Sequence, residues 1–285
     1  MDEKVRLGIT MNPKISVIMG IYNCADTLDE ALDSLLNQTY QNFEVIMCDD
    51  GSKDDTSAVA EGYVRRYPDK LRLLRNEKNM GLNYTLNKCL YEAKGEYIAR
   101  MDGDDVCDPT RFQKEVDFLD SHPEFALVST EMVMFDEEGD WGKTTVIERP
   151  QVNDFCTHTP FFCHAAAMIR KEVFLEVEGY TVDPRLLRVE DCHLWFKIYA
   201  KGHRGANIPE PLYKMRDDRN ATSRRSFKAR LNGCYVMFVG FKMVNMPWYK
   251  YIYALRNMVL ELIKAIFPSS VYESVHKRRC QKNRA

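Results

Sequence analysis

The stretch Tyr97-Ile98-Ala99-Arg100-Met101-Asp102-Gly103-Asp104-Asp105 places three carboxylates within four residues, after an apolar run that predicts a buried strand. Crowded carboxylates that are shielded from water repel one another, and leaving them unpaired costs free energy. We therefore expect a cation here, and a divalent metal with oxygen ligands fits best. Such a metal would bind a phosphate-bearing ligand. The alternative is a solvated acidic turn before a helix with Asp108 as N-cap and Pro109 at its first position.

Strands and helices alternate on the N-terminal side of this stretch. Apolar runs predict strands over residues 15–21, 43–48, 71–74 and 96–101, and helical spacing predicts helices over 28–36, 56–67 and 79–93. This alternation is typical of βαβ units, so we predict an α/β fold with a mostly parallel central sheet flanked by helices. Ligands bind beyond the carboxyl ends of such strands, where Tyr22, the Asp49-Asp50-Gly51-Ser52 turn and the acidic stretch all lie.

The second half of the chain has a less regular pattern. We predict strands over 125–135 and 165–169, a loop or hairpin over 136–151, and helices over 108–121, 171–177 and 190–200. From residue 227 onward the pattern is helical. There, one apolar stripe consists of Ile252, Leu255, Val259, Leu262 and Ile266.

Charge is distributed unevenly along the 285 residues. Residues 221–285 hold 13 Lys and Arg against 2 Asp and Glu, whereas residues 1–220 hold 27 against 40. A basic tail on an acidic body favours an anionic partner for the tail. The nine cysteines include no C-x-x-C pair, which argues against a structural zinc site and fits a reducing compartment. With no apolar leader and no apolar run of about 18 residues, we expect a cytoplasmic protein without a spanning helix.

Six motifs follow one another in a recognisable order: Ser16–Asn23, Ser34–Tyr40, Phe43–Ser52, Asn79–Leu82, Met101–Asp105 and Val189–Trp195. Together they resemble glycosyltransferase family 2, inverting enzymes with the Rossmann-like GT-A fold, over residues 14–215. The resemblance predicts an N-terminal tail over 1–13, a catalytic domain over 14–220 and a basic, amphipathic helical extension over 221–285.

The resemblance also implies site roles. It implies a nucleotide-sugar donor, usually a UDP-sugar, bound by Tyr22, Asp50, Gly81 and Asp102. It further implies Mn²⁺ or Mg²⁺ on the diphosphate, held by Asp102 and Asp104 with Asp105 adjoining. Asp191 of the Glu-Asp pair is the implied general base of a hexosyltransferase-type enzyme. Acceptor-binding or site-shaping roles are expected for the remaining candidates, which are Glu190, His164, Trp195 and Arg216.

Each of these residues also has a purely structural interpretation. Tyr22 and Trp195 could be core aromatic residues, and His164 a buried histidine that pairs within the fold. Asp50 could cap its own turn, and Asp191 could be favoured only by the dipole of its helix.

One segment departs from the family pattern. Many members have a histidine after the base helix that reaches the metal or diphosphate, and here Asp218 occupies that position. Arg216 remains nearby as a candidate diphosphate contact, with a surface salt bridge as the alternative.

The expected acceptor is a glycan or a lipid-linked sugar, by analogy with family members that build cell-surface polysaccharides. The C-terminal extension could bind the inner face of the plasma membrane through its basic and aromatic residues, or it could pack its stripe on the catalytic domain. A nucleotidyltransferase is a competing reading, but Tyr22–Asp26 lacks the Gly-rich basic loop of that class. A non-catalytic nucleotide-sugar binder is another. Nucleic acid is not expected, since no recognition motif is present and the body is acidic.

Overall fold

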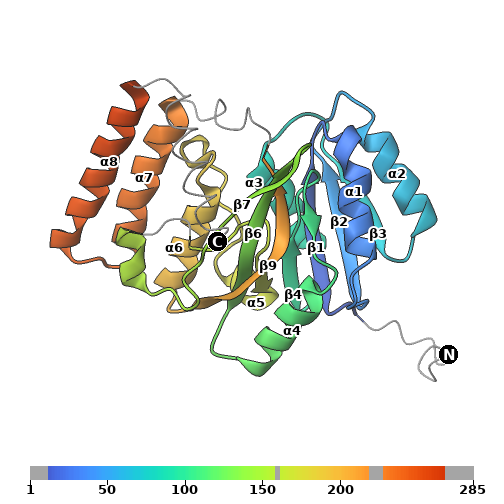
Figure 1. Cartoon of the computed structure of the whole chain (residues 1–285), viewed down its shortest axis with the longest axis horizontal. Coiled ribbons are helices and arrows are strands. Elements are labelled where there is room, and N and C mark those ends of the chain that lie inside the picture. Colours follow the sequence, from blue (N-terminus) through green and yellow to red (C-terminus); the bar gives the residue numbers. More distant parts are fainter. Residues whose placement is uncertain (1–11, 158–160, 218–226, 267–285) are drawn as a thin grey trace.

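The computed structural model describes residues 12–157, 161–217 and 227–266, with the side chains of residue 227 and of 261–266 left out. The expected tail over 1–13 therefore lies almost wholly outside the described residues, as do Asp218 and the basic residues beyond 266. The described elements form an α/β sheet with helices on both faces (Figure 1).

Four parallel strands form the N-terminal half of the sheet, in the order β3-β2-β1-β4. The register pairs Ile15 of β1 with Phe43 of β2 and with Tyr97 of β4. Strands β1 and β2 are buried almost throughout, which explains why their sequences are continuous apolar runs. Their bounds and those of the connecting helices are β1 (Ile15–Ile21), α1 (Ala25–Leu36), β2 (Phe43–Asp49), α2 (Thr56–Arg66), β3 (Leu71–Arg75), α3 (Leu82–Glu92) and β4 (Tyr97–Arg100).

The other half of the sheet mixes strand directions. Beyond β4 the order continues β8-β6-β9-β5, with β8 antiparallel to both β4 and β6, and β9 parallel to β6 but antiparallel to β5. Strand β7 extends β6 as a hairpin, one of the two options left open by the sequence. The bounds are β5 (Val106–Cys107), α4 (Arg111–Ser121), β6 (Leu127–Asp136), β7 (Gly139–Lys143), β8 (Met168–Arg170), α5 (Lys171–Glu176), α6 (Glu190–Ala200) and β9 (Gly205–Arg216).

Two details differ from the sequence prediction. Strand β9 was not predicted, because Pro209 and Pro211 lie inside it and proline cannot donate to a strand ladder. The N-cap role of Asp108 is wrong: α4 begins at Arg111 with Thr110 in the cap position. Asp108 instead accepts hydrogen bonds from the amide and hydroxyl of Thr110, which forms a turn before the helix.

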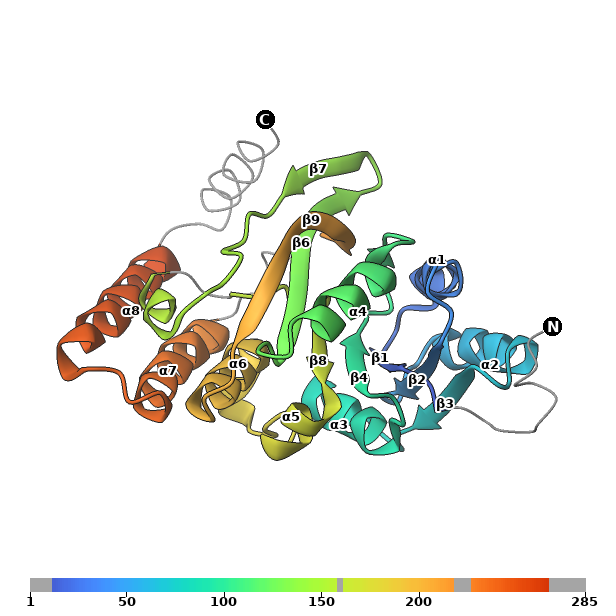
Figure 2. The same ribbon diagram turned by 90° about the horizontal axis from the view of Figure 1, so that it is seen from below.

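The two faces of the sheet carry separate apolar cores. Helices α1, α2 and α4 cover one face, and α3, α5 and α6 cover the other (Figure 2). Side chains of β4 alternate between them, so Tyr97, Ala99 and Met101 enter the first core while Ile98 enters the second. Arg100 follows Ile98 on the α6 side by the same alternation. The end of β4 therefore contributes side chains to both faces of the sheet.

Helices α7 (Phe227–Met243) and α8 (Tyr251–Ile266) pack as a pair beside α6, at the opposite end of the molecule from α2 (Figure 1). Phe241 of α7 contacts Phe196 of α6, and Ala254 of α8 is buried. The described residues of the predicted stripe of α8 are not covered by the catalytic body: Ile252, Leu255 and Val259 are 61%, 42% and 50% exposed. The side chains of Leu262 and Ile266 lie outside the described part. No described helix has both the length and the apolar character to cross a bilayer.

Candidate active site

The acidic stretch forms the loop between β4 and β5. Each of Asp102, Asp104 and Asp105 offers a carboxylate oxygen within 4.8 Å of the others. Partial loss of hydration in the loop and the charge of Asp102 raise the pKa of Asp104, and the pKa of Asp105 is raised well above its usual range by burial and by both neighbours. Each added negative charge is therefore unfavourable, and a divalent cation would relieve the repulsion.

Asp105 differs from the other two in its bonding. Its carboxylate accepts hydrogen bonds from the Tyr213 hydroxyl at 2.9 Å and the Arg216 amide at 2.7 Å, so both oxygens are bound to β9. Asp102 has one oxygen 2.6 Å from the Arg100 guanidinium, and Asp104 is exposed. An oxygen donor set of this kind suits Mn²⁺ or Mg²⁺. Asp102 and Asp104 are the better placed of the three predicted ligands to hold it.

Arg216 is held by protein groups on several sides. Its Nε donates to the Asp104 carbonyl at 3.0 Å, and its terminal nitrogen pairs with Glu30 of α1. Its guanidinium lies over the Phe135 ring, 4.5 Å from the centroid. The salt bridge that the sequence left as the alternative is therefore present. Arg216 fixes the acidic loop to β9 and α1, and a diphosphate contact stays a prediction.

The turn after β1 presents Tyr22, which is 45% exposed. The next residue, Asn23, has a φ of 48°, a left-handed conformation that asparagine tolerates better than most residues. Its side-chain oxygen accepts the Lys53 amide at 2.8 Å, and its own amide donates to the Ser52 hydroxyl at 3.1 Å. The turns after β1 and β2 are thereby joined, with the Tyr22 ring open to a ligand rather than buried in the core.

Asp50 is buried, and both of its carboxylate oxygens accept hydrogen bonds from protein groups. Its carboxylate accepts the Asn76 amide group and the Met80 amide at 2.8 Å each, and the Gly81 amide at 2.9 Å. Gly81 has a φ of 88°, which favours glycine. Asp50 and Gly81, two predicted donor-binding residues, therefore lie together, and Asp50 shapes the loop before α3. Direct contact of either with a donor stays a prediction.

The Glu190-Asp191 pair opens α6 directly after the N-cap residue Val189, and Arg188 before it has a φ of 69°. The Asp191 carboxylate accepts the Cys192 amide at 2.7 Å. Burial and the charge of Glu190 raise the pKa of Asp191 to about 6, against the lowering effects of that hydrogen bond and of Arg100. A carboxylate with such a pKa is suited to accept a proton near neutral pH.

His164 and Trp195 lie next to each other on the α6 side of the sheet. The His164 Nε2 shares a hydrogen bond of 2.7 Å with the Tyr180 hydroxyl, so the histidine has a structural partner. Burial and the positive charge of Arg100 hold the pKa of His164 well below its usual range, and the ring is neutral. Trp195 is fully buried and packs edge-on against His164 and Phe162. It can shape the site only through these neighbours.

Sequence reasoning missed three residues that link these parts: Arg100, Tyr180 and Tyr213. Arg100 donates to Asp102, Tyr180 is hydrogen-bonded to His164, and Tyr213 donates to Asp105. One signal was available, since an arginine within an otherwise apolar strand, two residues before an acidic cluster, must find a partner. The two tyrosines gave no such signal because their partners are distant in sequence.

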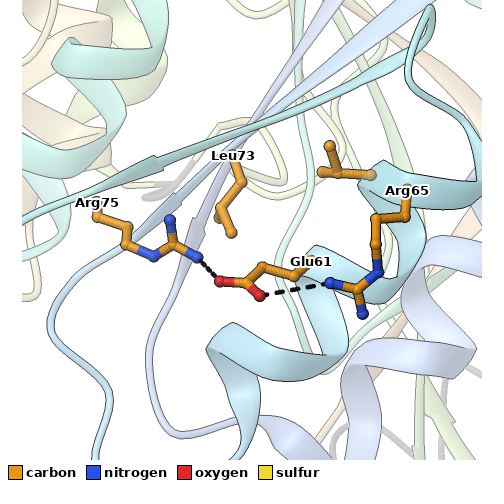
Figure 3. Close-up of a pocket in the computed structure, with 5 residues that line it drawn as sticks. Glu61, Arg65, Leu73 and Arg75 are labelled. Atoms are coloured by element: carbon orange, nitrogen blue, oxygen red, sulfur yellow. Dashed lines mark hydrogen bonds and ion pairs between the residues drawn. The ribbon is translucent and has the colours of Figure 1, made fainter.

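A surface hollow between α2 and β3 is lined by charged side chains that form ion pairs with one another. It is lined by Glu61, Val64, Arg65, Leu73 and Arg75, and Glu61 pairs with both arginines (Figure 3). Because these charged groups already neutralise one another, we assign no function to this hollow.

Comparison with known sequences identifies the family. The sequence model described as "Glycosyl transferase family 2" matches residues 16–177. The chain belongs to this family. The putative glycosyltransferase EpsE of Bacillus subtilis (strain 168) is 40% identical over 267 residues, 94% of each chain. The amylovoran biosynthesis glycosyltransferase AmsE of Erwinia amylovora is 32% identical over 74% of this chain and 79% of the relative.

Solved structures confirm the predicted fold. S. aureus TarS residues 1–349, in complex with UDP-GlcNAc, has a TM-score of 0.66 at 21% identity, over 87% of this chain and 71% of that chain. The mannosyltransferase PcManGT of Pyrobaculum calidifontis, in complex with GDP-Man and Mn²⁺, has a TM-score of 0.64 at 20% identity, over 96% and 84%. The α/β sheet flanked by helices and the helical C-terminal part are thus shared with these structures. The family match and the sequence relatives make glycosyl transfer the activity class of the chain.

Proposed function

We propose that this chain is a metal-dependent inverting glycosyltransferase, which moves a sugar from a UDP-sugar to a glycan or lipid-linked acceptor. The observation that carries the proposal is the presence of two differently placed acidic groups. Asp102 and Asp104 lie at the end of β4, and Asp191 opens α6 with a pKa of about 6. The first group suits a cation on a diphosphate, and the second suits a proton acceptor.

The residues divide the chemistry between them. Asp102 and Asp104 would hold Mn²⁺ or Mg²⁺, which when bound supplies Lewis-acid stabilisation of the departing diphosphate. Asp191 accepts the proton of the acceptor hydroxyl as its oxygen attacks the anomeric carbon. The bond to the diphosphate breaks on the opposite side, so a single displacement inverts the configuration. Glu190 raises the proton affinity of Asp191 by its charge.

The donor pocket is proposed at the ends of β1 and β2. The exposed Tyr22 ring would stack on the base. Asp50 holds the amides of Met80 and Gly81, so these residues present a defined loop edge to the ribose and diphosphate. Support for UDP comes from TarS, whose structure holds UDP-GlcNAc.

The acceptor proposal draws on a relative from Escherichia coli. That protein, WfaP, is named UDP-Glc:alpha-D-GlcNAc-diphosphoundecaprenol beta-1,3-glucosyltransferase, and it is 27% identical over 86% of this chain and 94% of its own length. A lipid-linked acceptor places the enzyme at a membrane. We therefore assign the exposed stripe of α8, defined by Ile252, Leu255 and Val259, to the anionic inner face of the plasma membrane. Basic residues of α7, of the segment before α8 and of α8 itself favour this surface, and they include Lys242, Lys250 and Arg256.

A donor screen by thermal unfolding tests the proposal. A ligand that binds only the folded chain stabilises it by about 2.7 kcal/mol at a hundredfold excess over Kd. We expect one UDP-sugar to raise Tm more than other nucleotide sugars, and more in Mn²⁺ than in chelator. Release of UDP on addition of a lipid-linked acceptor then reports transfer. If no nucleotide sugar changes Tm, the donor assignment is refuted. If a UDP-sugar raises Tm but no UDP is released with an acceptor, the chain is a non-catalytic binder.

A further inference from the structure

The loop that leads into α6 has few buried side chains of its own. Between Val182 and Arg188 only the Leu186 side chain is buried. Arg188 has a φ of 69°, a left-handed conformation that a residue other than glycine keeps only where the surrounding structure holds it. Contacts from outside the loop must therefore fix its path, and these contacts also fix where α6 begins.

Helix α7 of the C-terminal extension provides such contacts. The Asn232 side chain is 6% exposed, and its Nδ2 donates to the Leu187 carbonyl at 3.1 Å and to the Pro184 carbonyl at 3.4 Å. The Arg185 guanidinium lies over the Tyr235 ring, 4.7 Å from its centroid. Asn232 and Tyr235 are three residues apart, so they lie on one side of α7. That side of the helix holds the loop through both its backbone and a side chain.

The hydrogen bonding continues from the loop into the first turn of α6. The Val189 amide donates to the Leu186 carbonyl at 3.2 Å, and the Val189 carbonyl accepts the His193 amide at 3.1 Å. Within the described residues, the Asp191 carboxylate is hydrogen-bonded only to Cys192 of its own helix. The position of this carboxylate therefore follows the position of the first turn of α6.

Attachment of α7 to the body does not by itself require Asn232. Phe241 of α7 already packs against Phe196 of α6, with ring centroids 6.2 Å apart. Burying an amide group costs free energy of desolvation that an apolar contact does not. What the amide adds is direction, because its hydrogen bonds to two carbonyls determine where the loop backbone lies.

We propose that Asn232 is a positioning residue for sugar transfer: it fixes the loop before α6, and this loop sets where Asp191 lies relative to the acceptor hydroxyl. The proposal rests on the proposed function, in which Asp191 accepts the proton of that hydroxyl. It makes α7 a part of the catalytic unit and not only a support for α8. A misplacement of about 1 Å can lower the rate of an enzyme by as much as about 10²-fold.

The test is a double-mutant cycle in the full chain, with Asn232→Ala made in the wild-type and Asp191→Asn backgrounds. Asn207→Ala is the matched control, because Asn207 of β9 is 3% exposed and also donates its Nδ2 to two loop carbonyls. Release of UDP is measured below the Tm of every variant, with the UDP-sugar that raises Tm most and GlcNAc-diphosphoundecaprenol as acceptor. Hydrogen exchange over residues 183–193 is measured without donor.

We expect Asn232→Ala to lower kcat about tenfold in the wild-type background, because the base is displaced. In the Asp191→Asn background the loss should be less than about twofold, because a side chain that accepts no proton gains little from exact placement. The shift in Tm with donor should stay near that of wild type, and exchange over residues 183–193 should become faster. Asn232→Gln keeps the amide and should recover part of the rate.

Asn207→Ala should lower Tm while leaving kcat and the exchange of residues 183–193 near wild type. A loss of kcat in Asn207→Ala as large as in Asn232→Ala would overturn the proposal, and so would equal losses in the two backgrounds, because destabilisation alone would explain either result. An unchanged kcat in Asn232→Ala would overturn it as well.

Two further outcomes are distinguishable from these. If Asn232→Ala fails to fold, Tyr235→Leu removes the ring beneath Arg185 and is carried through the same cycle with the same expectations. If Asp191→Asn transfers sugar at the wild-type rate, the base assignment of the proposed function fails, and the route from Asn232 through Asp191 fails with it. Exchange over residues 183–193 then decides separately whether Asn232 holds the loop.

Discussion

At the scale of single residues, Asp105 and Asp104 show how neighbours divide roles within one loop. Asp105 is bound to Tyr213 and to the Arg216 amide, so its loss would release β9 from the loop. Asp104 faces solvent and repels Asp102, so its loss removes a charge that the folded chain does not need. The two positions should therefore respond differently to mutation.

Asp104→Ala is expected to abolish transfer while leaving the fold intact, because it removes a metal ligand and one repulsive charge. Circular dichroism and Tm should match wild type, and Mn²⁺ affinity should fall by at least about tenfold. Asp105→Ala is the matched comparison and should lower Tm. Full turnover of wild type in excess chelator would contradict the metal assignment.

Asp191→Asn preserves shape and hydrogen bonding but cannot accept a proton. We expect donor affinity near wild type and a loss in kcat of roughly 10²-fold or more. A thermal shift with donor checks the binding, and a steady-state assay checks the rate. An unchanged rate with lost donor binding would make Asp191 a binding residue instead.

The pH profile of wild type follows from the same group. Asp191 must be ionised to act as base, and its pKa is about 6. Activity should therefore be full above this value and decline as the pH falls through it. An acid limb near the ordinary pKa of a carboxyl, about 4, would show that another group controls the profile.

At the scale of elements, helix α7 packs closely against α6 because residue 240 of α7 is a glycine, which has no side chain. A Cβ at Gly240 would lie 2.1 Å from the Phe196 ring, whereas a Cβ at Gly233 on the same helix would meet nothing within 4 Å. Glycine at position 240 allows the helix to approach the ring closely. The helical extension is thereby attached to the helix that begins with Glu190 and Asp191.

This contact gives a paired prediction on stability. Gly240→Ala should lower the free energy of unfolding by about 1–3 kcal/mol, because overpacking forces the ring or helix to move. Gly233→Ala should raise it by up to about 1 kcal/mol, because alanine favours the helix. Denaturant titration of both variants checks this, and equal effects of the two would show that α7 does not pack on α6 as described.

At the scale of the whole molecule, the uneven charge and the exposed stripe of α8 point to one surface. The extension is basic, the body is acidic, and three apolar residues of α8 are exposed on one side. An anionic bilayer would attract the extension and repel the body. The enzyme should therefore dock in one orientation, with α8 against the lipid.

Co-sedimentation with vesicles tests this docking. Wild type should bind vesicles in which about one third of the lipid is anionic, and it should bind them more weakly in high salt. Ile252→Ser with Val259→Ser should weaken binding at least about tenfold, because two exposed apolar side chains that would enter the bilayer are lost. Tyr91→Ser with Leu175→Ser is the control, since both residues are exposed on other helices. Equal binding by the two double variants would contradict docking through α8.

Much of the fold is encoded locally. Strands β1 and β2 and helix α1 could be predicted directly from the sequence. A strand that is buried on both faces is a continuous apolar run, and a helix that is buried on one side has apolar residues at helical spacing. The carboxyl ends of parallel strands meet at one edge, so the convergence of Tyr22, Asp50 and Asp102 also followed from the order of elements.

Other features depend on partners that are distant in sequence. Only the tertiary structure shows Asp105 bound to β9, Asp50 bound to the loop before α3, and Arg100 paired with Asp102. It also shows that Ile252, Leu255 and Val259, the described residues of the apolar stripe of α8, are exposed rather than packed. The sequence alone determined which residues are apolar, charged or conformationally free. Whether a carboxylate is paired or a stripe is covered depends on what folds against it, and a local pattern holds no record of that.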